Sequence, residues 1–502
     1  MREYYTKIAR EGSISFSSQL ISIVLNYLTA IFITRALGAE GYGTYCLGYS
    51  IIQTLTIFAG LGLSDALIRY IALFLGKNDL PSAKGVWHTV SRFMMVTYLL
   101  LTISIFFSAP LIAQYVFHKP ELTPIIRILS LSYPALSVTL LVDCYFKANK
   151  NLLIPSLLQN VFSPGGKLIF AVGIFFLSLN ETEWSWAFAL NSFLIAMIAI
   201  YFYQKITNWR DKKATSISLK TLLQFSLPIW GAQAIPVILG QLNVLLLGFF
   251  YESKEVGIYK VYVFFASFIS FGFGSLAGIF YPVFSELVSK GNKFAMQDLY
   301  QRVTKWFHLI SFNLSFLVLM TGLWFVPILF GEDYRLTSPT VLYLIISGHI
   351  LNSLTGPDYM TLKSLGWTKF FFLSSCFAFV SNLVFGYIFI PKYGIAGAAL
   401  ATMISTGIRH FYGLHIIRNN LRIKILSKQA RNFLVVGLPF LLIFFYMNYV
   451  LFYSLKLTLI IIDCCLIIFY TIIVIKLKII DSEDRFIIFK FYNKIIGAHS
   501  KD

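Results

Sequence analysis

The sequence has 502 residues, of which 57% are hydrophobic and only 13% are charged, and its mean hydropathy is +0.74. A soluble globular protein carries about 25% charged residues, so this composition excludes a soluble enzyme or binding domain. The net charge of +19 does not indicate a nucleic-acid-binding surface, because the basic residues lie in short segments between long apolar stretches.

Fourteen apolar stretches are long enough to cross a bilayer. Lipid offers the backbone no hydrogen-bond partner, so a spanning segment is a helix of about 20 residues or a strand of a closed barrel. None of these stretches alternates with the period of two that a barrel strand requires. The predicted spans are 13–34, 42–74, 93–113, 123–143, 152–178, 184–203, 221–250, 256–287, 306–330, 337–357, 370–390, 394–417, 432–452 and 457–475. We therefore expect an all-α polytopic membrane protein with about 14 transmembrane helices.

Lysine and arginine are distributed unevenly between the two sides of these spans. Of the 41 basic residues, 31 lie on the side of the N-terminus and 8 on the opposite side. The positive-inside rule then puts both termini in the cytoplasm of a multi-pass protein of the cell (inner or plasma) membrane. Because the N-terminus is charged and the first apolar stretch is long, we expect that stretch to stay in the protein rather than be cleaved as a signal peptide.

The first predicted span carries a polar stripe at helical spacing. Its members share one helix face and are Ser15, Ser18, Ser22, Asn26 and Thr29, with Gln19 beside them. Serine and threonine are common where membrane helices pack on one another, so helix packing is one interpretation. A stripe along nearly the whole span favours the second interpretation, the wall of a water-filled cavity.

Three charged residues lie at the end of the first span and in the second. Arg35 ends span one, where its long side chain can reach the interface. Asp65 and Arg69 are four residues apart, so they can pair on one face of span two. Either this pair lies at the cytoplasmic rim, or it faces a transport path, where Asp65 is a candidate for coupling to an ion.

The fifth predicted span contains Ser163-Pro164-Gly165-Gly166-Lys167. Proline removes a helix hydrogen bond and glycine loosens the backbone, so we expect a broken helix here. A charge at this depth costs about 2.5–3.5 kcal/mol on insertion scales and usually faces a cavity or the interior of a bundle. A broken helix with a cation is suited to an anion site in a transporter. The alternative is that Lys167 reaches the outer surface of the membrane.

Later spans carry further candidates. Lys260 lies about one turn inside span eight, and His349 lies near the middle of span ten, where it could bind or relay a proton. Packing is the alternative for each. Arg409 and His410, like the basic loop 418–431, are expected to contact anionic headgroups. The five cysteines show no metal-ligand spacing, so we expect no metal site and no cofactor.

The chain repeats itself weakly at a sequence offset of 214 to 216. The matching positions are Gln19 and Gln233, Gly43-x-Tyr45 and Gly257-x-Tyr259, Gly60 and Gly274, and Asp143…Lys147 and Asp358…Lys363. An offset of six helices leaves both copies in the same orientation. We therefore expect two pseudo-symmetric six-helix lobes related by an axis along the membrane normal, with the second helix of each lobe broken at Gly60 or Gly274. The predicted parts are 1–206 (helices 1–6), 207–431 (helices 7–12) and 432–502 (helices 13 and 14 and a cytoplasmic tail).

Two motifs at the start of this repeat resemble a known family. Arg35-x-Leu37-Gly38-x3-Tyr42-Gly43 is followed by Gly60-Leu61-Gly62-x2-Asp65-x3-Arg69-Tyr70. This pattern resembles the opening of the oligosaccharide flippases (Wzx-type) of the polysaccharide transporter family. They share a superfamily with multidrug-and-toxin exporters and the lipid II flippase. The spans, the predicted cytoplasmic termini and the repeat extend the resemblance over the whole chain.

The resemblance implies that the chain moves a polyprenyl-diphosphate-linked oligosaccharide, such as an O-antigen unit, from the inner to the outer leaflet by alternating access. A diphosphate crossing hydrocarbon needs positive charge, which arginine supplies in bidentate form. Arg35 and Arg69 lie in the matched motif, whereas Lys167 and Lys260 rest on depth alone. The predicted cavity residues are Arg35, Arg69, Lys167, Lys260, Asn26, Gln19 and Gln233. A coupling ion, proton or sodium, would use Asp65 or His349.

Alternatives to this prediction remain open. A drug or cation exporter of the same superfamily would need acids in the cavity, where basic residues outnumber them. A membrane enzyme such as a polymerase, ligase or glycosyltransferase would need acids or bases on a sizeable loop, and no such loop or catalytic motif occurs in the sequence. We therefore predict a non-enzyme. Its expected partners are the lipid-linked glycan, membrane lipids and a polymerase or glycosyltransferase of the same pathway, and no nucleic acid.

Overall fold

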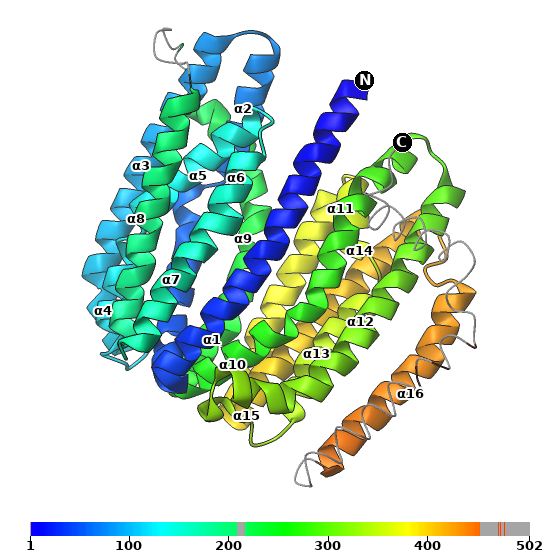
Figure 1. Ribbon diagram of the computed structural model, residues 1–502. Coiled ribbons are helices and arrows are strands. Elements are labelled where there is room, and N and C mark those ends of the chain that lie inside the picture. Colours follow the sequence, from blue (N-terminus) through cyan, green and yellow to red (C-terminus); the bar gives the residue numbers. More distant parts are fainter. Residues whose placement is uncertain are drawn as a thin grey trace, which may run out of the picture. The chain divides into compact units, whose positions relative to one another are not determined.

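The computed structural model describes residues 2–207, 215, 217–451, 470, 472 and 476 (Figure 1). These residues are almost entirely helical, and no strand occurs among them. Nine of the described helices are long and apolar enough to cross a membrane. The prediction of an all-α polytopic membrane protein is therefore confirmed.

Helix α15 contains two predicted spans, and α1 contains span one and the first part of span two. Helix α1 (Arg2–Gly60) is interrupted at Gly38, with φ 65° and ψ −179°, and α15 (Thr368–Leu421) is interrupted at Gly394, with φ 56° and ψ −130°. Both backbone conformations are essentially restricted to glycine. The two glycines therefore mark the turns between spans one and two and between spans eleven and twelve.

The second span of each copy of the repeat is built from two helices. In the first copy α1 ends at Gly60, and the chain passes through Leu61 and Gly62, both with positive φ, into α2 (Leu63–Gly76). In the second copy α10 (Ser253–Ala266) is separated from α11 (Phe268–Ser289) at Ser267. The predicted break at Gly274 is wrong, because Gly274 lies inside α11. The Ser267 hydroxyl instead bonds to the Phe264 carbonyl at 2.6 Å, a local bond that competes with the helix.

The remaining described helices follow the predicted order closely. In the first copy they are α3 (Leu80–Leu111), η1 (Ile112–Val116), α4 (Leu122–Ser130), α5 (Tyr133–Ala148), α6 (Leu153–Leu157), η2 (Leu158–Phe162), α7 (Ser163–Phe176) and α8 (Glu181–Ile206). In the second copy and beyond they are α9 (Leu219–Phe250), α12 (Lys293–Phe330), η3 (Glu332–Tyr334), α13 (Thr340–Leu354), α14 (Asp358–Ser364) and α16 (Lys428–Leu451). The predicted span 457–475 falls almost wholly outside the described residues.

Polar caps define where several of these helices begin. The Asp79 carboxylate accepts a hydrogen bond from the Ser82 amide at 3.1 Å and so satisfies an unpaired donor at the start of α3. At the start of α8 the Asn180 side chain accepts from the Thr182 amide at 2.9 Å, while Glu183 accepts from the Asn180 amide at 3.1 Å. This reciprocal capping box fixes the turn between spans five and six.

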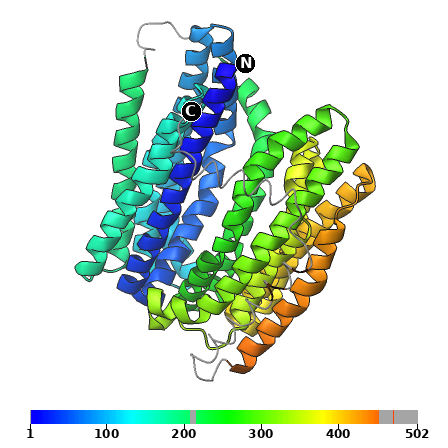
Figure 2. The same cartoon turned by 45° about the vertical axis from the view of Figure 1, so that its right-hand side comes forward.

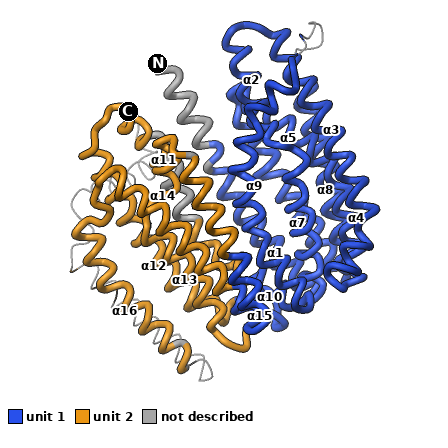
Figure 3. Tube along the Cα trace, turned by 180° about the vertical axis from the view of Figure 1, so that it is seen from behind, with its two compact units in different colours: residues 1–261, 326–335, 382–398 blue, residues 262–325, 336–381, 399–502 orange. Residues whose placement is uncertain are grey.

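The chain packs into two compact units (Figure 3). Unit 1 consists of residues 1–261, 326–335 and 382–398, and unit 2 of residues 262–325, 336–381 and 399–502. Within each unit the helices run roughly parallel to one another (Figures 1 and 2). Unit 1 has an aromatic core in which Trp87 stacks on Tyr203, with ring centroids 4.9 Å apart. The predicted boundaries at 206 and 431 follow the sequence repeat, whereas these units follow the packing.

The two copies of the repeat meet inside unit 1 at a pair of glycines. A Cβ atom on Gly43 would lie 1.7 Å from the Ser253 carbonyl oxygen, and one on Gly257 would lie 2.1 Å from the Ala39 carbonyl oxygen. The repeat relates Ala39 to Ser253 and Gly43 to Gly257 by the same sequence offset. Each glycine therefore packs on the equivalent carbonyl of the other copy, as two-fold related surfaces do. This contact supports the predicted pseudo-symmetry.

Candidate functional site

Span five widens at the position where the sequence predicts a break. Pro164 has no amide hydrogen to bond the carbonyl one turn earlier, at Asn160. The helix responds with a π-helical turn, η2, directly before α7, which has Pro164 in its first turn. The predicted broken helix is wrong, because residues 153–176 are helical throughout. A π-bulge of this kind absorbs the missing bond without a gap.

Gly166 brings α8 close to this widened turn. A Cβ atom on Gly166 would lie 2.0 Å from Asn191 Oδ1, so only glycine fits. The Asn191 side chain also donates from Nδ2 to the Ser163 carbonyl at 3.2 Å. The glycine thus allows α7 and α8 to pack closely. This packing holds the backbone next to Lys167 in place.

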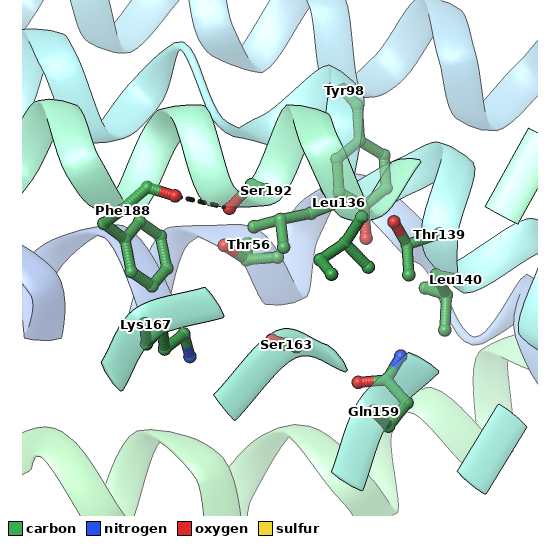
Figure 4. A pocket seen from close by; sticks show the side chains of 11 residues that line it. Thr56, Tyr98, Leu136, Thr139, Leu140, Gln159, Ser163, Lys167, Phe188 and Ser192 are labelled. Atoms are coloured by element: carbon green, nitrogen blue, oxygen red, sulfur yellow. Dashed lines mark hydrogen bonds between the residues drawn. The ribbon is translucent and has the colours of Figure 1, made fainter. Parts of the chain in front are cut away.

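Lys167 borders a cavity of about 240 Å³ inside the first copy of the repeat (Figure 4). Gln159, Ser163 and Lys167 lie on successive turns of span five, and Figure 4 shows them across the cavity from Tyr98 and Thr139. The walls combine these polar side chains with the apolar side chains of Leu136, Phe188 and Ile195. The cavity is smaller than the roughly 300–1,000 Å³ of pockets for drug-sized ligands, so it suits one phosphate or one sugar ring.

Within the described part of the chain, Lys167 has no carboxylate partner. Its ammonium lies 5.1 Å from the centroid of the Phe188 ring, and no ion pair joins it to an acid. A cation at this depth without a counter-ion is costly, about 2.5–3.5 kcal/mol on insertion scales. The arrangement is therefore suited to an anion that enters the cavity.

Lys260 lies where the two copies of the repeat meet. Its ammonium donates to Gln241 Oε1 at 3.3 Å, and the same oxygen accepts from the Ser50 hydroxyl at 2.9 Å. The Cys46 thiol is within electrostatic reach of Lys260, and the repeat makes these two positions equivalent as well. Lys260 is thus close to the pseudo-symmetry axis, one helical turn from the contact between Gly43 and Gly257.

Arg35 is held at the end of another helix. Its guanidinium donates from Nε to the Leu329 carbonyl at 2.8 Å and from a terminal nitrogen to the Ile328 carbonyl. These carbonyls are at the C-terminal end of α12, where a cation is favourable. Arg35 also borders a second cavity, of about 320 Å³, together with Asp333 and Tyr334.

The predicted pairing of Asp65 with Arg69 is wrong. The Arg69 guanidinium instead lies over the Phe225 ring, 4.2 Å from its centroid, and 5.7 Å from that of Tyr70. Stacking of this kind keeps the guanidinium exposed on one side and draws it away from Asp65. Among the described residues, no ion pair or hydrogen bond is formed by the Asp65 carboxylate, which is half-buried.

Some residues of the polar stripe of span one pack against other helix residues, and others are exposed. Ser18 is buried and accepts from Asn160 Nδ2 of span five at 2.9 Å. Asn26 bonds back to the Ser22 carbonyl at 2.7 Å, whereas Gln19 and, in α9, Gln233 have exposed side chains. The stripe thus holds span one against span five at Ser18 and leaves polar groups accessible beside it.

A buried cluster in unit 2 differs from the sequence-based expectation. His410 is buried, and its Nδ1 lies 3.0 Å from both Asp358 oxygens, while Arg409 approaches its Nε2 at 3.0 Å. The prediction that His410 contacts lipid headgroups is therefore wrong. The repeat could have indicated this cluster, because Asp358 matches the ion-paired Asp143. His349 bonds to the Ser270 hydroxyl at 3.0 Å.

Comparison with known sequences relates the chain to proteins of polysaccharide biosynthesis and export. A family model described as "Polysaccharide biosynthesis protein" matches residues 8–288. An uncharacterized membrane protein of Methanocaldococcus jannaschii is 23% identical over 468 residues, which cover 87% of this chain and 89% of that protein. A candidate O-antigen transporter of Shigella flexneri is 30% identical over 100 residues, which cover 19% of this chain and 24% of that protein.

Solved structures with a similar fold are membrane transporters. The lipid II flippase MurJ in an inward closed conformation has a TM-score of 0.69 at 15% identity and covers 91% of this chain and 98% of its own. An inward-facing multidrug transporter of the MATE family also has a TM-score of 0.69, at 14% identity, and covers 82% and 98%. These similarities confirm the fold, with its two lobes, of a multi-pass membrane transporter.

Proposed function

Because the chain belongs to the polysaccharide biosynthesis protein family, we propose that it moves a polyprenyl-diphosphate-linked oligosaccharide across the membrane. Transfer runs from the inner to the outer leaflet and supplies the assembly of a cell-surface polysaccharide. Both termini lie in the cytoplasm, in line with the positive-inside distribution of lysine and arginine. A polymerase or glycosyltransferase of the same pathway is the natural partner at either side.

The observation that carries this proposal is the environment of Lys167. Its ammonium borders a cavity within the bundle to which several hydroxyl and amide groups contribute, and it has no acid beside it among the described residues. An exporter of cationic drugs would require the opposite charge there. A diphosphate supplies the missing anion, and lysine is a common phosphate ligand in proteins.

Each part of the cargo then finds a suitable environment. One phosphate of the diphosphate enters the cavity beside Lys167, and the hydroxyl and amide groups of Ser163, Gln159 and Thr139 replace water around it. The isoprenoid tail stays in lipid, because it gains nothing from leaving hydrocarbon. Lys260 provides a second cation near the pseudo-symmetry axis, so the anion can bind at two positions along its path.

Coupling of this movement to an ion is a separate part of the proposal. Asp65 and His349 are the candidates, since both are half-buried groups that can bind a proton. Arg35, Asn26, Gln19 and Gln233 complete the proposed polar path, with Arg35 at the end of the bundle where it caps α12. No metal or organic cofactor enters this scheme.

The proposal is tested by reconstitution in liposomes. The inner or outer leaflet is loaded with a fluorescent polyprenyl-diphosphate oligosaccharide, and a membrane-impermeant quencher then reports how much label has changed leaflets. We expect transfer only with the protein present, and slower transfer of a matched lipid in which a neutral linkage replaces the diphosphate. Protein-independent transfer, or equal transfer of both lipids, would contradict the proposal.

A second candidate function is supported by the similarity to MATE transporters. The solved structure named as a multidrug resistance transporter has the same TM-score against this chain as the lipid II flippase. Efflux of a fluorescent cationic dye from the same liposomes separates the two functions. Dye efflux without transfer of the lipid-linked glycan would favour the exporter.

A further inference from the structure

Two helix ends in unit 1 are capped by side chains from the other copy of the repeat. Lys119, in the turn between η1 and α4 of the first copy, donates from Nζ to the Gly248 and Tyr251 carbonyls of the second copy, each at 2.6 Å. Gly248 and Tyr251 lie at the C-terminal end of α9. Such ends leave carbonyls that need donors, and these are usually found locally.

The second cap repeats the first with the copies exchanged. Tyr334, which follows α12 of the second copy, donates from its hydroxyl to the Gly38 carbonyl of the first copy at 2.8 Å and approaches the Thr34 carbonyl at 3.4 Å. The offset of the sequence repeat relates Lys119 to Tyr334 and Thr34 to Gly248. The two caps therefore occupy equivalent positions of the repeat, although their chemistry differs.

The glycine contact lies close to these caps in the chain. Gly43 follows Gly38 by five residues, and Gly257 follows Tyr251 by six. Each of these glycines packs on a carbonyl of the other copy at a distance that admits no side chain. Four reciprocal contacts thus join the two copies at the end of unit 1 that is marked by Gly38.

We propose that Lys119, Tyr334 and the contact between Gly43 and Gly257 form a two-fold latch that holds this end of the transport path closed. Because the copies exchange donors, separating them here breaks both caps and the glycine contact in one motion. Lys260 lies one helical turn below the glycines, so opening the latch exposes this lysine to the side that the charge distribution predicts to be outside.

Both donors are chemically suited to a latch that stays closed at rest. Burial lowers the pKa of Lys119, but Glu121, Glu252 and Glu255 oppose that effect and favour its ammonium form. Burial raises the pKa of Tyr334, so its hydroxyl keeps the proton that it donates. A hydrogen bond from a charged donor to a buried carbonyl stabilises by about a factor of ten or more, and one from a neutral donor by somewhat less.

A native cysteine reports directly on the latch. Cys46 is buried, one turn beyond Gly43, and it is kept in a variant in which Cys144, Cys376, Cys464 and Cys465 are changed to serine. The full chain is reconstituted in liposomes, and a membrane-impermeant maleimide is added from the Gly38 side. We expect slow labelling of Cys46 in this background. Lys119→Met should accelerate labelling about tenfold, Tyr334→Phe severalfold, and the double variant by about the product of the two.

Tyr133→Phe is the matched control. The Tyr133 hydroxyl donates to the Ile52 carbonyl at 2.6 Å, a buried bond of the same type that joins two segments of one copy. This variant should leave the labelling rate of Cys46 unchanged. If Lys119→Met does not fold, the labelling rate of Cys46 in Tyr334→Phe, compared with that in Tyr133→Phe, still tests the latch.

Two results would overturn the latch. One is unchanged labelling of Cys46 in both Tyr334→Phe and a folded Lys119→Met. The other is equal acceleration by Tyr133→Phe, which would mean that the bundle has loosened generally. Neither result depends on the cargo, so the latch and the proposed flippase function can fail separately.

Discussion

Asp143 and Asp358 are equivalent carboxylates in the two copies of the repeat, yet their hydrogen-bond partners differ. Asp143 pairs with Lys147, one turn later on the same helix, at 2.6 Å, and the lysine side chain is 42% exposed. Asp358 pairs with His410, which lies on a different helix, and both side chains are at most 5% exposed. The repeat thus keeps the acid and its place in the fold, while the partner changes from a local one to a distant one.

This difference determines how much each site contributes to the stability of the fold. A pair with an exposed lysine is screened by solvent and contributes little to stability. A buried pair costs several kcal/mol when one partner is removed, because the other charge is left uncompensated. Arginine can only donate, so His410 Nε2 accepts from Arg409 and its Nδ1–H donates to Asp358. The second copy is therefore joined by a three-residue chain of hydrogen bonds.

Breaking the distant pair should have the largest effect on stability. His410→Leu leaves the Asp358 carboxylate and the Arg409 guanidinium buried without their shared partner. We expect the free energy of unfolding to fall by about 3–5 kcal/mol, measured by denaturant titration in detergent. An unchanged transition would show that this hydrogen-bonded chain does not stabilise unit 2.

The glycine contact should give an intermediate effect that is equal in the two copies. Gly43→Ala and Gly257→Ala each drive a methyl group into a backbone carbonyl, so each should destabilise by about 1–3 kcal/mol. Gly173→Ala is the control, because a Cβ atom there meets nothing within 4 Å. Unequal effects of the two interfacial variants in the same titration would contradict the two-fold relation.

Removal of the local pair should have the smallest effect. Lys147→Met deletes the partner of Asp143, whose side chain is only 6% exposed, but the lysine is 42% exposed, so solvent already screens the pair. We expect a loss below about 1 kcal/mol in the same denaturant titration. A loss as large as that of His410→Leu would mean that the two copies do not differ in the way described.

The helical fold and the repeat could be predicted from the sequence, because these depend on local composition and spacing. Hydropathy locates the spans, and the offset matches Gly43 with Gly257, whose contact only the structure shows. The break in span eight was misplaced, because a glycine inside a helix costs only about 1 kcal/mol and packing overrides it. Ser267, which breaks the helix instead, carries no such pattern.

Side-chain partners were harder to predict than positions. Arg69 was expected to pair with Asp65 by spacing, but Phe225, which belongs to a helix of the other copy, provides a ring for its guanidinium. His410, like the basic loop 418–431, was expected to contact lipid headgroups, but it is buried against the Asp358 carboxylate of another helix. Spacing along one helix indicates which residues can meet, whereas partners from other helices depend on tertiary packing.

Lys167 has no charged counterpart in the second copy, because the repeat offset of 214 to 216 leads to Ser381, Asn382 and Leu383, which are all uncharged. The most direct test of the account is the rate of leaflet transfer of a polyprenyl-diphosphate oligosaccharide by Lys167→Met, beside Lys147→Met as a control that also removes one lysine. We predict at least a roughly tenfold loss for Lys167→Met, as expected for a lost charge-assisted contact, and an unchanged rate for Lys147→Met. Equal rates for wild type and folded Lys167→Met would contradict the role of this lysine in carrying the anion.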